Sequence, residues 1–115
     1  MSQKILEKAL DTSPGNYPLT VKYAEILLAS GKPELAIKTL HGLSATRPSD
    51  LFIWYLLAES YGLAKNIPAL HEARAKFFSL KGNFEQAIKQ LSYALPLLSN
   101  DFQASARVRQ HMKDI

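Results

Sequence analysis

The chain has 115 residues, of which 47% are hydrophobic and 21% are charged, a balance typical of one soluble globular unit. It contains no cysteine, which excludes a disulfide framework, a thiolate zinc site and a cysteine nucleophile. The formal net charge is +4, but acidic residues interrupt the basic ones and no two basic residues are adjacent, so we expect no nucleic-acid-binding stripe. No apolar run approaches the roughly 20 residues that a membrane span needs.

Proline and glycine occur at regular intervals and divide the chain into helical segments. Proline suits the start of a helix and disfavours helix in the residue before it, whereas glycine can supply a left-handed cap. The expected helices lie near residues 3–12, 17–30, 33–46, 50–64, 68–81, 83–95 and 101–113. Asp50 and Asp101 are the expected N-caps. The connections are short, so neighbouring helices should run antiparallel.

The residues that end helices or form the turns between them recur with a period of 34 residues. Pro14 and Pro48 each close a helix and lie 34 residues apart. Gly31 and Lys65, each in an interhelical turn, are separated by the same interval. The segment 51–64 matches the pattern W-x2-L-G-x2-Y, with alanine in place of glycine, at Trp54, Leu57, Ala58 and Tyr61. This period and motif are those of the tetratricopeptide repeat, so the sequence predicts an all-α, TPR-like α-solenoid of stacked antiparallel helix pairs.

The repeat pattern is shifted in the middle of the chain. The expected parts of a single domain (1–115) are the second helix of a truncated repeat (3–14), a repeat (17–50), an unpaired TPR-like helix (51–64), a second repeat (68–101) and a C-terminal helix (101–113). The unit that begins at Pro68 follows Leu51 by only 17 residues, which is half a period. We therefore expect a half-repeat offset near residues 65–68.

The chain carries little that could support catalysis. His71 and Glu72 begin like the zinc motif H-E-x-x-H, but residue 75 is alanine, so the second imidazole of that motif is missing. Acidic residues occur singly, no motif marks a Ser-His-Asp site, and glycine-rich phosphate loops are absent. We expect no catalytic residue, metal site or cofactor in this chain, which by itself is not an enzyme.

The candidate binding residues are Phe52, Tyr55, Glu59 and Lys76. In a tetratricopeptide unit one stripe of the first helix packs into the core, and the next stripe tends to line the concave groove. This register assigns Trp54 and Tyr61 to the core and leaves Phe52, Tyr55 and Glu59 on one groove-facing stripe. Lys76, on the following helix, is placed to reach a partner carboxylate. The alternative is that helix 68–81 tilts across this face and buries Tyr55 as core.

A closer likeness covers about residues 17–113 and is carried by the segments LFIWYLLAESY (Leu51–Tyr61), LHEARAKFFSL (Leu70–Leu80), GNFEQAIKQL (Gly82–Leu91) and FQASARVR (Phe102–Arg109). These segments resemble the C-terminal domain of the β-barrel assembly-enhancing proteases, which are bacterial periplasmic zinc metalloproteases with an N-terminal H-E-x-x-H domain. The resemblance implies a periplasmic domain that docks the protease onto outer-membrane assembly machinery or its substrates. It transfers no catalytic residue, because the zinc motif lies outside this chain.

Three functions are compatible with these observations. The first is a protein-interaction module that recruits a protein or peptide partner to a catalytic neighbour. The second is a structural or gating role, in which the helices pack on the protease domain in cis. The third is a TPR adaptor or scaffold unrelated to proteolysis.

Overall fold

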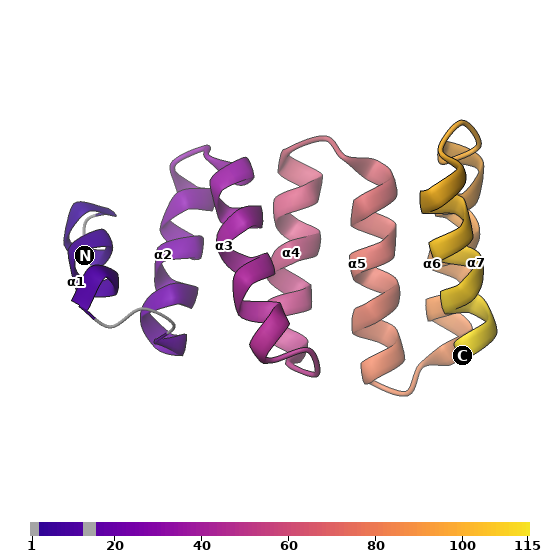
Figure 1. Cartoon of the computed structure of the whole chain (residues 1–115), viewed down its shortest axis with the longest axis horizontal. Coiled ribbons are helices and arrows are strands. Elements are labelled where there is room, and N and C mark those ends of the chain that lie inside the picture. The colour runs from indigo at the N-terminus through magenta and orange to yellow at the C-terminus, as the bar shows by residue number, and fades with distance from the viewer. Residues whose placement is uncertain (1–2, 13–15) are drawn as a thin grey trace.

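The computed structural model of the chain describes residues 3–12 and 16–115, and these residues form seven α-helices. The helices are α1 (Gln3–Thr12), α2 (Tyr17–Ala29), α3 (Pro33–Thr46), α4 (Leu51–Leu63), α5 (Ile67–Leu80), α6 (Phe84–Leu97) and α7 (Phe102–Asp114). They follow one another along the 42 Å axis of an elongated body, with α6 and α7 overlapping at one end of the view (Figure 1). The predicted all-α arrangement is confirmed.

Side-chain oxygens begin most of these helices by accepting hydrogen bonds from free backbone amides. Asp50 Oδ1 accepts from the amide of Phe52 at 2.9 Å, and Asp101 Oδ1 accepts from the amide of Ala104 at 3.0 Å, as the sequence predicts. Asparagines that the sequence analysis did not select cap three further helices in the same way, namely Asn16, Asn66 and Asn83.

The sequence predicts that the first and the sixth helix end at prolines. We expected the sixth helix to end at residue 95, before Pro96, but α6 continues through this proline to Leu97. Pro96 is the second-last residue of α6, so the bend that its ring forces has no following turns to misalign, and its cost is smaller than in a helix centre. The expected end of the first helix at Pro14 lies outside the described residues.

Three interhelical turns share one backbone geometry. Gly31, Lys65 and Gly82 each have a positive φ, of 74°, 60° and 79° respectively. In the first turn the amide of Gly31 donates to the carbonyl of Leu28 at 3.1 Å, and the next amide donates to that of Leu27 at 2.8 Å. The other two turns repeat both bonds, which together form the Schellman cap.

Helix α5 lies between two of these turns and packs on both of its chain neighbours. The turn at Lys65 joins it to α4, and the turn at Gly82, 17 residues later, joins it to α6. The half-period spacing in the sequence therefore coincides with a helix that has the same kind of turn at each end. How the chain divides into repeat units stays a prediction.

The buried side chains form two clusters, and α5 contributes to both. The first cluster joins α2 to α5 and contains Val21, Ala24, Leu40, Leu43, Ile53, Leu56, Leu57, Ala58 and Ala73. The second joins α5, α6 and α7 and contains Ala75, Leu91, Ala94 and Val108. Ala73 and Ala75 are two residues apart and so point to nearly opposite sides of α5. Alanine at these positions lets the neighbouring helices approach closely.

The left-handed turn at Lys65 yields a prediction about stability. Glycine adopts a positive φ without the steric penalty that a Cβ incurs, so Lys65→Gly should raise the free energy of unfolding by about 1 kcal/mol. Lys65→Ala keeps the Cβ and removes only the charge, so it should give no such gain. Urea denaturation of the three proteins tests this, and an equal gain for alanine and glycine would contradict it.

Candidate functional site

A pocket of about 700 Å³ lies over one face of α5, between α3 and α4 on one side and α7 on the other. We call it the α5 pocket. Its aromatic, imidazole and charged lining residues include His41, Trp54, Tyr61, Glu72, Lys76, Arg107 and His111. These side chains come from four helices, so the pocket exists only in the folded solenoid. Its volume lies in the range of ligand-binding clefts in proteins.

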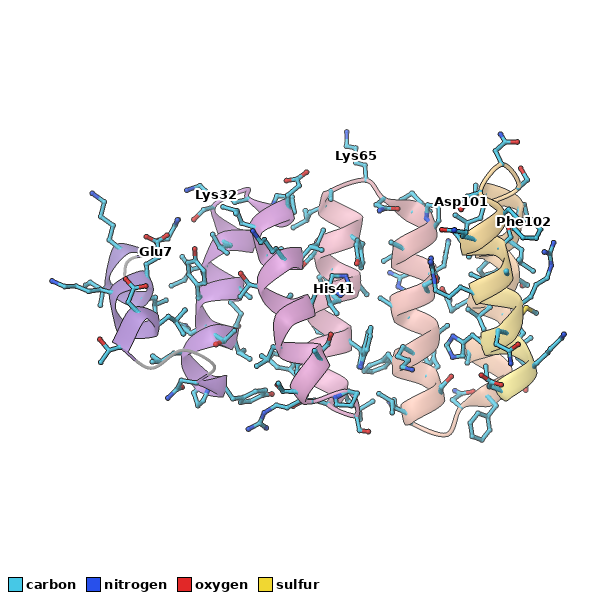
Figure 2. All side chains as sticks on the ribbon, in the orientation of Figure 1. Glu7, Lys32, His41, Lys65, Asp101 and Phe102 are labelled. Carbon is cyan, nitrogen blue, oxygen red and sulfur yellow. The ribbon has the colours of Figure 1, made fainter. Side chains whose placement is uncertain are left out.

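Polar contacts tie the walls of the α5 pocket to its floor. Arg107 of α7 donates to Glu72 of α5 through Nε and Nη2, each at 2.9 Å, in a two-pronged ion pair. The hydrogen bonds with this carboxylate raise the pKa of Arg107. His41 of α3 reaches toward α4 (Figure 2), where its Nε2 shares a hydrogen bond with the hydroxyl of Tyr61. Burial is the main cause that raises the pKa of Tyr61.

Trp54 and Tyr61 line this pocket, although the sequence assigned both to the core. Each packs against the first buried cluster but remains partly exposed. The reason is that α5 offers alanines at positions 69 and 73 on this side, which are too short to cover the two rings. The indole Nε1 of Trp54 donates to the carbonyl of Pro48 at 2.8 Å, and Lys76 Nζ lies 5.8 Å from the centre of the indole ring. The indole is therefore fixed in place beside a cation.

A second, shallower pocket of about 360 Å³ lies on a different face of the α4–α5 pair. It is lined by Leu51, Phe52, Tyr55 and Phe77, which we call the aromatic patch. The rings of Phe52 and Tyr55 are nearly parallel, with centroids 6.1 Å apart, and the Tyr55 and Phe77 centroids are 6.5 Å apart. Phe52 is 43% exposed and Tyr55 is 48% exposed. The alternative interpretation, in which helix 68–81 buries Tyr55 as core, requires a buried ring, whereas this ring is half exposed.

The structure brings together two of the four predicted binding residues. Phe52 and Tyr55 lie in the aromatic patch, whereas Lys76 lies in the α5 pocket beside Trp54. Glu59 is exposed and lines neither pocket. That these residues contact a partner stays a prediction, but they do not form one continuous groove.

Sequence reasoning missed Phe77 and the ion pair between Glu72 and Arg107. Phe77 is not among the four binding residues that the sequence predicts. The two partners of the ion pair are 35 residues apart, and no local pattern signals their contact.

The residues that begin like a zinc motif have other partners. His71 Nδ1 shares a hydrogen bond with Gln90 Oε1 at 2.8 Å, and its ring centroid lies 5.4 Å from that of Tyr93. Glu72 is held by Arg107. Within residues 3–12 and 16–115, no group of three His, Asp or Glu side chains is arranged to hold a metal ion. His71 therefore serves the packing of α5 on α6.

His111 of α7 is partly buried in the α5 pocket, with its Nε2 3.4 Å from Ser79 Oγ. Burial is the main cause that lowers the pKa of this imidazole, and the nearby ammonium of Lys76 lowers it further. The carboxylates of Asp114 and Glu72 oppose the shift without cancelling it. The neutral imidazole is therefore the form that the fold favours.

This lowered pKa predicts a loss of stability on acidification. Because the pKa of His111 lies below its ordinary value of 6.5 in the folded state, the unfolded chain binds more protons as the pH falls through 6.5. The free energy of unfolding should therefore decrease between pH 7.5 and pH 5.5, and His111→Gln should make the decrease smaller. Thermal melts of both proteins across this range test the prediction, and identical pH profiles would contradict it.

Comparisons with known proteins agree with this architecture. The tetratricopeptide-repeat family model matches residues 3–60. A protein of Vibrio cholerae serotype O1 whose name assigns it to the β-barrel assembly-enhancing proteases is 34% identical over 89 residues, which is 77% of this chain but only 18% of the relative. A solved structure, the MamA RS-1 ArsTM double mutant, superposes with a TM-score of 0.65 at 20% identity, over 97% of this chain and 62% of that one.

The structural likeness supports the fold, and the family match identifies the repeats as tetratricopeptide repeats. Each helix in the described part of the chain is too short or too polar to reach across a lipid bilayer. The repeat period, the stacked helices and the family match together show that the chain belongs to the tetratricopeptide-repeat family.

Proposed function

We propose that this domain is the non-catalytic docking module of a periplasmic zinc-dependent protease, and that it brings the protease to outer-membrane assembly machinery or to its substrates. The chain spans 18% of the length of the relative from Vibrio cholerae. The protease activity of a longer protein that contains this domain is therefore part of what we propose. Tetratricopeptide domains bind proteins through surfaces that several stacked helices build together. The proposal needs such a surface on this chain.

The aromatic patch is the observation that carries the proposal. On one face of the molecule lie together the rings of Phe52, Tyr55 and Phe77, and the first two are about half exposed. Single exposed apolar residues are common on protein surfaces, but a group of exposed apolar side chains is typical of a protein-binding surface. Tyrosine is a suitable anchor because it buries a large ring at a low cost in side-chain entropy and keeps a hydroxyl for a polar partner. We expect Phe52 and Tyr55 to make the main contacts, and Glu59 and Lys76 to add polar contacts beyond the patch.

The character of the patch also favours a second function, packing on the protease domain in cis. The four residues that line the patch are all uncharged, although Lys81 Nζ lies near the ring of Phe77, and permanent interfaces are more apolar than transient ones. In that case the partner of Phe52 and Tyr55 would be the protease domain itself, and the domain would brace or gate the active site. An adaptor unrelated to proteolysis would use the same surface for a different partner.

Replacing Tyr55 tests the docking function. Tyr55→Ala should abolish capture of the purified outer-membrane assembly complex, or of an unfolded outer-membrane β-barrel, by the immobilised domain. It should change the free energy of unfolding by less than about 1 kcal/mol, because the ring is half exposed. Tyr93→Ala is the matched control, since Tyr93 is also 48% exposed but lies on α6.

The outcomes separate the alternatives. Packing in cis would be favoured if the wild-type domain binds a purified protease domain, Tyr55→Ala does not, and neither the outer-membrane assembly complex nor the unfolded β-barrel (the two envelope partners) is captured. A stable Tyr55→Ala variant that captures its partner as well as the wild type would place the contact surface elsewhere.

A further inference from the structure

Lys76 lines the α5 pocket and forms no ion pair within the described part of the chain. Glu72 is engaged by Arg107 through both of its oxygens, so these two charges neutralise each other. Asp114, the other carboxylate that lines the pocket, accepts a hydrogen bond from the amide of Gln110 at 2.9 Å and keeps its negative charge. Among the described residues, no carboxylate forms an ion pair with Lys76.

An indole ring and an imidazole lie near the ammonium group of Lys76 in the α5 pocket. Its ammonium lies 5.8 Å from the ring centre of Trp54, and the bond from the indole to the carbonyl of Pro48 holds that ring in place. His111 lines the same pocket from α7, next to Ser79. The pocket therefore presents an ammonium, an imidazole able to donate one hydrogen bond, and an exposed aromatic face from three different helices.

We propose that the α5 pocket is a binding site for an acidic side chain within an extended segment of a partner polypeptide. The carboxylate would accept hydrogen bonds from Lys76 Nζ and from the ring of His111, and a neighbouring apolar side chain would pack on the indole of Trp54. This inference rests on the proposed function only in requiring that the domain binds polypeptides.

Two features favour an acidic partner of this kind. A carboxylate supplies the ion-pair partner that Lys76 lacks among the described residues, and the formal net charge of +4 on the chain steers acidic partners toward it. The volume of about 700 Å³, bounded by four helices, has room for several side chains, which suits a passing segment rather than a single group.

Trp54 provides a direct readout because it is the only tryptophan in the chain. The probes are two synthetic heptapeptides with both ends capped, each with two phenylalanines flanking the central residue, which is glutamate in one and glutamine in the other. Titration of the whole domain, followed by Trp54 fluorescence, should show at least fivefold tighter binding of the glutamate peptide. A third peptide, with central glutamine and a free C-terminal carboxylate, should bind no better than the capped glutamine peptide.

Variants then assign the preference to the pocket. Lys76→Gln should bring the two capped peptides to within about twofold of each other, and Lys76→Arg should keep most of the difference. Lys81→Gln is the matched control, because Lys81 also lies near an aromatic ring but does not line the α5 pocket: it caps the end of α5, with its Nζ 5.3 Å from the ring centre of Phe77. His111→Gln should reduce the preference for glutamate without abolishing it.

Three results would overturn the proposal: equal binding of both capped peptides to the wild type, equal loss of preference in Lys76→Gln and Lys81→Gln, or tightest binding of the peptide with the free terminus. If the capped peptides bind equally while the outer-membrane assembly complex is still captured, only this inference fails. If the glutamate peptide binds through Lys76 but no envelope partner is captured, the inference holds and the docking function fails.

Discussion

The structure depends on the burial of α5 from two sides at once. Ala73 packs into the cluster shared with α4, and Ala75 packs into the cluster shared with α6 and α7. Both side chains are small, so both neighbours approach closely, and the left-handed turns at Lys65 and Gly82 return the chain tightly enough to permit it. A large side chain at either alanine would separate the two halves of the solenoid, because a close-packed interior tolerates little added volume.

The same constraint determines where the two candidate surfaces lie. With two of its sides buried, α5 has its remaining side chains between them. Glu72 and Lys76 are four residues apart and share one face, which becomes the floor of the α5 pocket. Phe77 follows Lys76 directly and so projects about 100° around the helix, where it completes the aromatic patch. A charged surface and an apolar surface therefore arise from adjacent residues of one helix.

Local chemistry made the helices predictable, whereas the site depended on contacts that are distant in sequence. Proline, glycine and the caps at Asp50 and Asp101 act within one helical turn, so their effects can be deduced from a few neighbouring residues. The grouping of Lys76 with Phe52 and Tyr55 assumed the single concave groove of a regular array. The structure instead has Lys76 in the α5 pocket and the two rings in the aromatic patch, on a different face of the α4–α5 pair. No local signal places Glu72 beside Arg107.

The ion pair between Glu72 and Arg107 matters more for the charge of the pocket than for stability. The side chain of Arg107 is 62% exposed and that of Glu72 is 22% exposed, and pairs in such solvated positions contribute about 0–1 kcal/mol. Yet both oxygens of Glu72 are taken by the guanidinium, so this carboxylate is not free to neutralise Lys76 one turn away on the same face. Arg107 belongs to α7, so the last helix of the solenoid is what engages Glu72, and the same helix brings the carboxylate of Asp114 into the pocket lining.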